Sequence, residues 1–167
     1  VHPDLVPIGE YQRVTSTDAG WKHLNFSART VQKGEEWMSS TRENEICIVL
    51  LGGAFTIESK WGIWLTDHSR KDVFSGFPHA AYFPPNTDFV LTAESETTDF
   101  AVGSTVGTDG YTGYFITPEQ IQSMGIELRG GDNASRQINS ILPPGAACSK
   151  LVCVEVYTPS GNWSSFP

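Results

Sequence analysis

This chain of 167 residues has few charged side chains, because Asp, Glu, Lys and Arg make up only 18% of it, against about 25% in an average soluble protein. It contains no run of eighteen apolar residues, so the sequence predicts no membrane span. Its 11 Lys and Arg are outnumbered by 19 Asp and Glu, which gives a net charge of −8. Nucleic-acid binding requires a basic face, so this balance argues against a nucleic-acid partner. An anionic ligand would have to be met by a few locally placed Arg or Lys side chains.

Cysteine is also scarce. The three cysteines, Cys47, Cys148 and Cys153, are odd in number, and two of them lie in apolar strand patterns where a reduced thiol acts as a small hydrophobe. The first four residues, VHPD, have neither the basic region nor the apolar core of a signal peptide. The sequence therefore predicts a reduced, cytoplasmic protein.

Turn residues between short β-type segments are plentiful, with 16 Gly and 10 Pro. Segments rich in β-branched and aromatic residues recur about every ten residues, which is typical of a sandwich or barrel of the jelly-roll type. They lie at residues 45–51, 54–59, 61–66, 80–83, 89–93 and 100–104. Gly52-Gly53 stands between the first two and predicts a hairpin that pairs them.

One short helix is predicted near residues 118–124. Thr117 suits the N-cap, Pro118 suits the first helical position, and Gln120 completes a capping box. Gly125 is placed to end the helix. The predicted fold is therefore all-β with one short helix.

The last residues read as an interior segment. Residues 151–157 form an almost unbroken apolar run, which predicts a strand buried on both faces. Glu155 interrupts this run, and a buried carboxylate needs a partner, for which Arg136 is one candidate. A turn at residues 158–162 is followed by Trp163 and Phe166. Because natural tails are usually polar, these aromatics suggest a chain that continues into further core.

The sequence offers no obvious catalytic group. A metal site of the jelly-roll enzymes needs several histidines and a Glu at close spacing, whereas four histidines are scattered here: His2, His23, His68 and His79. His68 and His79 flank one predicted hairpin region and could approach each other, but two ligands alone would make a weak site. No Ser lies in a nucleophile-elbow motif, and Cys148 is the one cysteine expected to be exposed. We expect no catalytic residue and no metal in this chain.

Three arginines are the predicted substrate-binding residues: Arg70, Arg129 and Arg136. A guanidinium group binds a carboxylate through two parallel hydrogen bonds, so these side chains could hold the acid group of a ligand. The sequence leaves a structural alternative open, in which they tie the connecting segments to the barrel. The acidic partners would then be Asp72, Asp132 or Glu155.

The stretch VEVYTPSGNWSSFP (154–167) resembles the inter-domain segment of the 5-deoxy-glucuronate isomerases of inositol catabolism. These are two-cupin proteins related to the 5-keto-4-deoxyuronate isomerases. The resemblance continues upstream, in order, through EICIVLLGG (45–53), RKDVF (70–74), AYFPP (81–85) and RGGDN (129–133) with Arg136. It covers nearly the whole chain, and GNWSS is its most specific block.

The resemblance implies an N-terminal cupin-type jelly roll at residues 1–150, rich in connecting segments from 105 to 150. Residues 151–167 would be an inter-domain strand and turn that lead to a second cupin, which is missing here. The implied activity is aldose–ketose isomerisation of 5-deoxy-glucuronate to 5-dehydro-2-deoxy-gluconate, with a small sugar acid as partner and a homo-oligomer as a further option. A divalent metal, zinc or manganese, would belong to the second cupin, so this chain alone is expected to be inactive.

The rival interpretation is a non-catalytic single cupin that binds a sugar or mediates oligomerisation. Such a protein would be self-contained and would end in polar residues. The aromatic side chains near the end of the chain argue against it.

Overall fold

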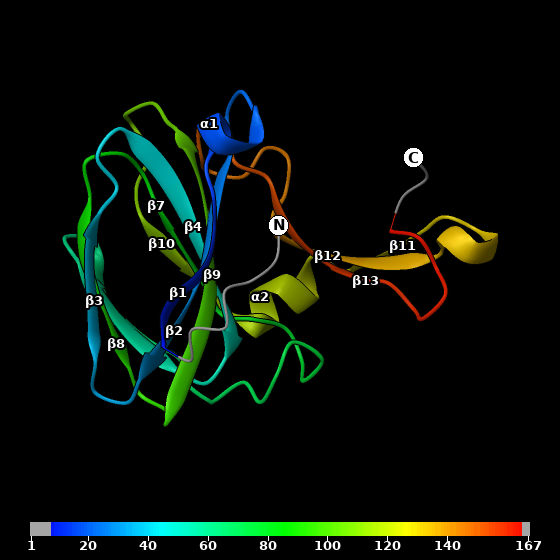
Figure 1. The fold of residues 1–167 in the computed structure, drawn as a ribbon, viewed down its shortest axis with the longest axis horizontal. Coiled ribbons are helices and arrows are strands. Elements are labelled where there is room, and N and C mark those ends of the chain that lie inside the picture. Colours follow the sequence, from blue (N-terminus) through cyan, green and yellow to red (C-terminus); the bar gives the residue numbers. More distant parts are fainter. Residues whose placement is uncertain (1–7, 165–167) are drawn as a thin grey trace.

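The computed structural model describes residues 8–164, which form a two-layered β-sandwich and a β-arm that projects from it (Figure 1). One layer is a six-stranded sheet, in spatial order β1 (Gly9–Val14), β2 (Asn25–Gln32), β9 (Thr97–Val106), β4 (Asn44–Gly52), β7 (Ala80–Phe83) and β10 (Tyr114–Ile116). The other layer has four strands, in the order β3 (Glu36–Ser40), β8 (Asp88–Ala93), β5 (Phe55–Ser59) and β6 (Gly62–Leu65). The arm consists of β11 (Ile126–Arg129), β12 (Arg136–Leu142) and β13 (Cys153–Tyr157). Within residues 8–164, no helix is long and apolar enough to cross a membrane.

Strand β4 is buried on both faces. Ile46, Ile48 and Leu50 pack into the core between the two sheets. Cys47 and Val49 point the other way, into a second apolar cluster that includes Ile121 of the helix α2 (Pro118–Ser123) and residues of β12. This double burial explains why the sequence is continuously apolar here instead of alternating.

The predicted β-type segments are confirmed, but the predicted hairpin at Gly52-Gly53 is wrong. Strand β4 pairs with β7 and β9, whereas β5 pairs with β6 and β8 of the other sheet. Gly53 has a φ of +82°, and a Cβ there would lie 2.3 Å from the Thr97 carbonyl oxygen. The two glycines therefore allow the chain to cross between sheets at a point of close backbone contact.

The predicted helix is confirmed as α2, with Thr117 and Gln120 forming the capping box. The prediction of a single helix is wrong, because the structure has a second one, α1 (Ser16–Ala19). Thr15 caps it, since its hydroxyl accepts from the backbone N–H of Asp18. A 3-10 turn, η1 (Asp132–Ala134), lies in the arm. The Thr-x-x-Asp signal of α1 was present in the sequence, but no apolar periodic run follows it to mark a helix.

Strand β13 is buried on one face only, so the prediction of burial on both faces is wrong. Cys153, Glu155 and Tyr157 lie on the partly buried face. Val154 and Val156 lie on the other face, with exposed fractions of 41% and 39%. One face of β13 is therefore apolar but is not packed against any other described part of the chain.

Some predictions concern residues outside those the structure describes. They are the aromatic Phe166 and the histidine His2. Trp163 is described and has an exposed fraction of 57%, while its backbone N–H donates to the carbonyl of Asn133 in the arm.

A buried carboxylate attaches the arm to the sandwich. Glu45, near the start of β4, is fully buried. Its Oε2 accepts from the Tyr82 hydroxyl and from the Ser149 N–H, both at 2.7 Å. Its Oε1 accepts from the N–H groups of Lys150 at 2.6 Å and Leu151 at 2.9 Å. Three successive backbone amides thus bind one carboxylate and hold residues 149–151 against β4, just before β13 begins.

We expect Glu45→Gln to lower the free energy of unfolding by about 3 kcal/mol, because the amide NH₂ cannot accept and would leave buried N–H donors unsatisfied. The control Tyr82→Phe removes one donor and leaves the carboxylate in place, so it should cost about 1.5 kcal/mol. Urea unfolding measures both values. A Glu45→Gln variant as stable as the parent would contradict the anchoring role.

Candidate functional site

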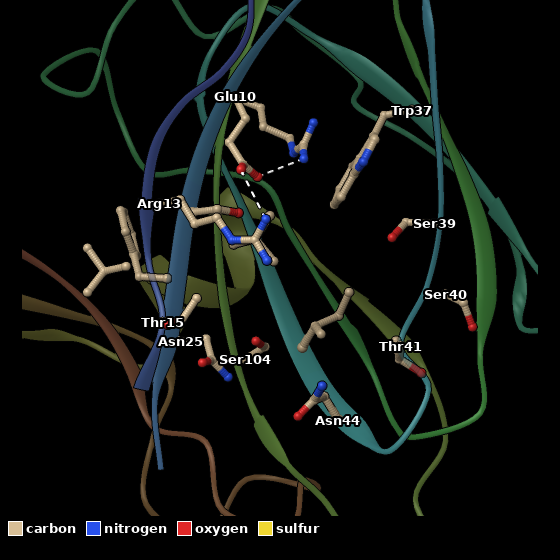
Figure 2. A pocket seen from close by; sticks show the side chains of 16 residues that line it. Glu10, Arg13, Thr15, Asn25, Trp37, Ser39, Ser40, Thr41, Asn44 and Ser104 are labelled. Carbon is tan, nitrogen blue, oxygen red and sulfur yellow. Dashed lines mark hydrogen bonds and ion pairs between the residues drawn. The ribbon is translucent and has the colours of Figure 1, made fainter. Parts of the chain in front are cut away.

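A polar pocket opens at one end of the sandwich, with a volume of about 390 Å³. Strands β1, β2, β3, β4 and β9 line it, together with the loops beside them. Figure 2 shows Glu10 and Arg13 on one side of the pocket and Trp37 and Ser39 on the other. Hydroxyl and amide side chains supply the rest of the polar lining: Thr15, Asn25, Ser40, Thr41, Asn44 and Ser104.

Two arginines share one carboxylate in this pocket. Arg29 Nη2 donates to Glu10 Oε2 at 2.7 Å, and Arg13 Nη1 lies 3.7 Å from Glu10 Oε1. The Arg29 guanidinium lies 4.9 Å from the centre of the Trp37 ring, within cation–π range. Arg29 Nε is buried and has no hydrogen-bond partner among the described residues. The pocket therefore carries a local excess of positive charge in an acidic chain.

A catalytic metal does not fit this pocket. Among the described residues that line it, Glu10 is the single carboxylate, and none is His or Cys. A divalent ion that is to activate a substrate needs three or four convergent N, O or S donors. The polar lining suits binding through hydrogen bonds and guanidinium groups instead.

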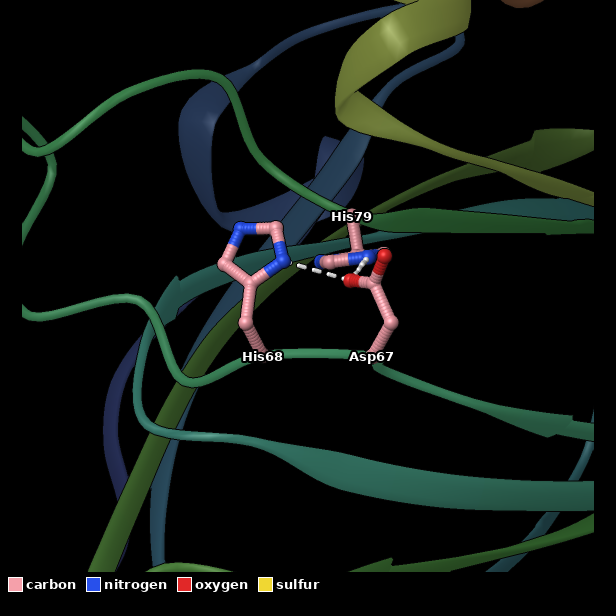
Figure 3. Close-up of side chains that lie close together, drawn as sticks. All are labelled: Asp67, His68 and His79. Carbon is pink, nitrogen blue, oxygen red and sulfur yellow. Dashed lines mark ion pairs between the residues drawn. The ribbon is translucent and has the colours of Figure 1, made fainter.

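Two histidines and an aspartate lie close together outside the polar pocket (Figure 3). Asp67 Oδ1 lies 2.5 Å from His68 Nδ1 and 2.9 Å from His79 Nε2. His79 is buried and stacks on Phe115, with ring centres 5.5 Å apart. Burial is the main reason why the pKa of His79 is lowered, and the Asp67 carboxylate opposes that shift.

His68 and His79 thus approach each other, as the sequence allowed, with ring centres 5.0 Å apart. Asp67 was missed as their common neighbour. The three donor atoms lie within 4.8 Å of one another, a set that could hold a divalent ion. The Leu50 N–H donates to the His79 carbonyl at the far end of β4, whereas Asn44, at its near end, lines the polar pocket. The cluster and the pocket are thus separate sites.

Arg70 has the structural role that the sequence left open as an alternative to substrate binding. Its side chain is buried, and its Nη1 donates to the Leu50 carbonyl at 2.7 Å. Its Nη2 contacts both carboxylate oxygens of Glu155, at 2.8 and 3.0 Å, and the carbonyls of Val73 and Gly76. The partner of Glu155 is therefore Arg70 and not Arg136. These bonds join the arm to the loop that follows β6.

Tyr157 completes this junction. Its hydroxyl donates to the Val73 carbonyl and lies 2.8 Å from Glu155 Oε2. Burial, together with the neighbouring Glu155 carboxylate, raises the pKa of Tyr157 to about 12. The phenol therefore stays protonated and can act as a donor at neutral pH.

Arg129 and Arg136 lie together, in a groove of about 510 Å³ on the arm. Arg129 Nε donates to Glu127 Oε1, and both side chains are more than half exposed. Phe74 and Tyr157 line the same groove. The structure thus groups two of the three predicted arginines and separates them from the polar pocket. Their role in substrate binding stays a prediction.

Sequence reasoning missed the charged residues of the polar pocket, although β2 carried a signal for them. Val31 of this strand belongs to the core between the sheets, and Asn25, Ser27 and Arg29 precede it at alternate positions. Side chains at alternate positions share one face of a strand. The change from apolar to polar on an inward face marks the start of the pocket.

An antiparallel sandwich of this topology, with a pocket inside one end, defines a jelly-roll protein of the cupin type. The model of the KduI/IolB family matches residues 6–167, so the chain belongs to that family.

The chain is similar to bacterial proteins named 5-deoxy-glucuronate isomerase. The 5-deoxy-glucuronate isomerase of Geobacillus kaustophilus is 34% identical over 160 residues, which cover 95% of this chain and 56% of that protein. The protein of the same name from Geobacillus thermodenitrificans is also 34% identical, over 95% of this chain and 57% of its own length. The chain therefore spans about half the length of these curated relatives.

Among solved structures, an IolB-like protein from Salmonella typhimurium LT2 superposes with a TM-score of 0.87 at 26% identity. The match covers 96% of this chain and 60% of that one. The resemblance to 5-deoxy-glucuronate isomerases that the sequence indicated is thereby confirmed at the level of family and fold.

We expect Arg70→Lys to lower the free energy of unfolding by about 3–5 kcal/mol, because a single ammonium group cannot replace the forked guanidinium and would leave Glu155 poorly paired in a buried site. Arg129→Lys is the matched control, since its pair with Glu127 is exposed and should change stability by about 0.5 kcal/mol or less. Urea unfolding followed by Trp fluorescence measures both. Equal effects of the two substitutions would refute the assigned role of Arg70.

Proposed function

We propose that this chain is the N-terminal cupin of a two-cupin aldose–ketose isomerase that converts 5-deoxy-glucuronate to 5-dehydro-2-deoxy-gluconate. The observation that carries this proposal is its identity of 34%, over 95% of the chain, to proteins named 5-deoxy-glucuronate isomerase. A small sugar acid is then the partner of the whole protein. Cytoplasmic location and assembly into a homo-oligomer stay predictions from the sequence.

The chemistry of this reaction belongs, in our proposal, to the second cupin. Isomerisation moves a proton between neighbouring carbons through an enediol, with an acid–base group and a divalent ion that polarises the oxygens. The polar pocket of this chain lacks the donors for a divalent ion, because none of the described residues that line it is His or Cys. Its one carboxylate, that of Glu10, is bound by Arg29 and so is not free to act as a base. We therefore assign zinc or manganese to the second cupin, and to this chain a role as scaffold and packing surface.

The arm supports this division of the protein. Apolar side chains stand exposed on it and beside it: Phe74, Ile126, Leu128, Val154 and Val156. Exposed apolar side chains that gather on one element mark an interaction surface. The curated relatives extend over nearly twice the matched length, and in the proposed two-cupin protein the second cupin would cover the arm.

The rival function is a non-catalytic single cupin that binds a sugar or mediates oligomerisation. The named relatives do not favour it, because they are isomerases. A single cupin would also leave the apolar side chains of the arm in water unless another copy covered them.

We expect residues 1–167 alone not to isomerise 5-deoxy-glucuronate, and a version extended to the length of the relatives to do so with loss of activity after chelation. The physical reason is the missing set of metal donors in the polar pocket. A coupled assay of product formation measures turnover. Turnover by residues 1–167, or an extended protein inactive on every uronate tested, would overturn the proposed division.

Residues 1–167, purified and dialysed, should carry well under one zinc, manganese or iron ion per chain. Asp67 and His68 are exposed, so of the three donors His79 alone is fixed by burial, and one Asp67 oxygen already pairs with both imidazoles. No open coordination site is therefore preformed. Elemental analysis gives the metal content. One ion per chain that is lost in both His68→Ala and His79→Ala would place a metal in this half of the protein.

A further inference from the structure

We infer that the polar pocket of the sandwich is a binding site for a small hydroxylated carboxylate such as a sugar acid, with Arg29 and Arg13 holding the acid group and Trp37 facing the carbon skeleton. This site is distinct from the catalytic site assigned above to the second cupin. The inference rests on the chemistry of the pocket and does not depend on the proposed isomerase activity.

The charges in the pocket favour an anion. Arg13 and Arg29 are opposed by Glu10 alone, so one positive charge is left over in a chain whose net charge is −8. Glu10 binds Arg29 closely but lies 3.7 Å from Arg13, whose side chain is 68% exposed. The Arg13 guanidinium is therefore free to turn toward a ligand at the mouth of the pocket. A planar carboxylate matches the forked geometry of guanidinium.

Arg29 is prepared for a ligand. Its Nη2 binds Glu10, while its buried Nε lacks a partner among the described residues. Buried donors are normally satisfied, so the protein does not use the full hydrogen-bonding capacity of this guanidinium. The Arg29 side chain lines the pocket and is 25% exposed, so the accessible part of the guanidinium is open to a carboxylate of the ligand.

Trp37 forms a fixed apolar wall. Its ring lies 5.2 Å from that of Phe89 and 5.3 Å from that of Phe100, so the indole is held by the core of the sandwich. Arg29 packs over the same ring system. A wall of this kind suits the C–H groups of a sugar, because ligand sites combine apolar surface with a few placed polar groups.

The opposite lining offers free hydrogen-bonding groups. Ser39, Asn44 and Ser104 come from three different strands, and their side chains make no hydrogen bond to another described residue. Figure 2 shows Asn44 and Ser104 close together at the end of the pocket away from Glu10. They suit the hydroxyl groups of a ligand whose acid group sits at the arginines. At about 390 Å³ the pocket falls in the usual size range of small-molecule sites.

The test is a titration of residues 1–167, whose sandwich has its own buried core, with D-glucuronate. Nuclear magnetic resonance follows the Trp37 indole N–H and gives the dissociation constant. We expect saturable one-to-one binding, at least about tenfold weaker for D-glucose, which lacks the carboxylate. Inorganic phosphate should also bind more weakly, because it cannot use the hydroxyl and amide groups as a sugar acid does.

Substitutions locate the site. Arg29→Gln should weaken D-glucuronate binding by about tenfold or more, and Arg13→Gln by several-fold. Lys71→Gln is the control for the lost positive charge, since Lys71 is exposed and does not line the pocket, and it should leave binding unchanged. Arg129→Gln tests the groove on the arm as the alternative place of binding. Thermal melting of each variant checks that it is folded.

Several outcomes would overturn the inference. These are no saturable shift of the Trp37 signal, equal binding of D-glucose and D-glucuronate, tighter binding of phosphate, or a loss caused by Arg129→Gln and not by Arg29→Gln. The last result would move the site to the groove on the arm. Because the readout is binding and not turnover, failure here leaves the isomerase proposal standing, and failure of the isomerase assay leaves this inference standing.

Discussion

The arrangement of this molecule depends on the satisfaction of one buried carboxylate, that of Glu45. Its four hydrogen-bond donors come from β7 and from three successive amides in the segment that precedes β13. A carboxylate buried without such donors would cost several kcal/mol, so the segment has to remain where its amides point at β4. The position of the whole arm relative to the sandwich follows from this local requirement.

The ion pair of Arg70 and Glu155 is a second contact that fixes the arm against the sandwich. The guanidinium binds carbonyls of β4 and of the loop after β6, and it binds the carboxylate of β13. One face of β13 is thereby committed to the junction, which explains why a strand with an apolar sequence carries a glutamate. The other face, with Val154 and Val156, is left for a neighbour. In the proposed two-cupin protein that neighbour is the second domain.

The two ends of the sandwich differ in chemistry although the same strands run between them. Strand β4 carries Asn44 at the polar pocket, apolar residues through the middle, and Leu50 beside the histidine cluster. An apolar centre is required to hold the sheets together, while the ends are free to take polar side chains. A family whose chemistry we assign to another domain can therefore keep a binding pocket here.

Local patterns in the sequence were enough for the strands, for α2 with its capping box, and for the family, because each depends on residues close together along the chain. Local patterns were not enough to predict strand pairing, because Gly52-Gly53 is equally compatible with a hairpin and with a crossing between the two sheets. The candidate site was missed for a related reason: Glu10, Arg29 and Trp37 meet only after β1, β2 and β3 have been placed in two different sheets. In the same way, Asp67 pairs with His79, and Arg70 pairs with Glu155, which lies 85 residues further along the chain. Contacts of this range depend on the packing of strands, which periodicity within one strand does not encode.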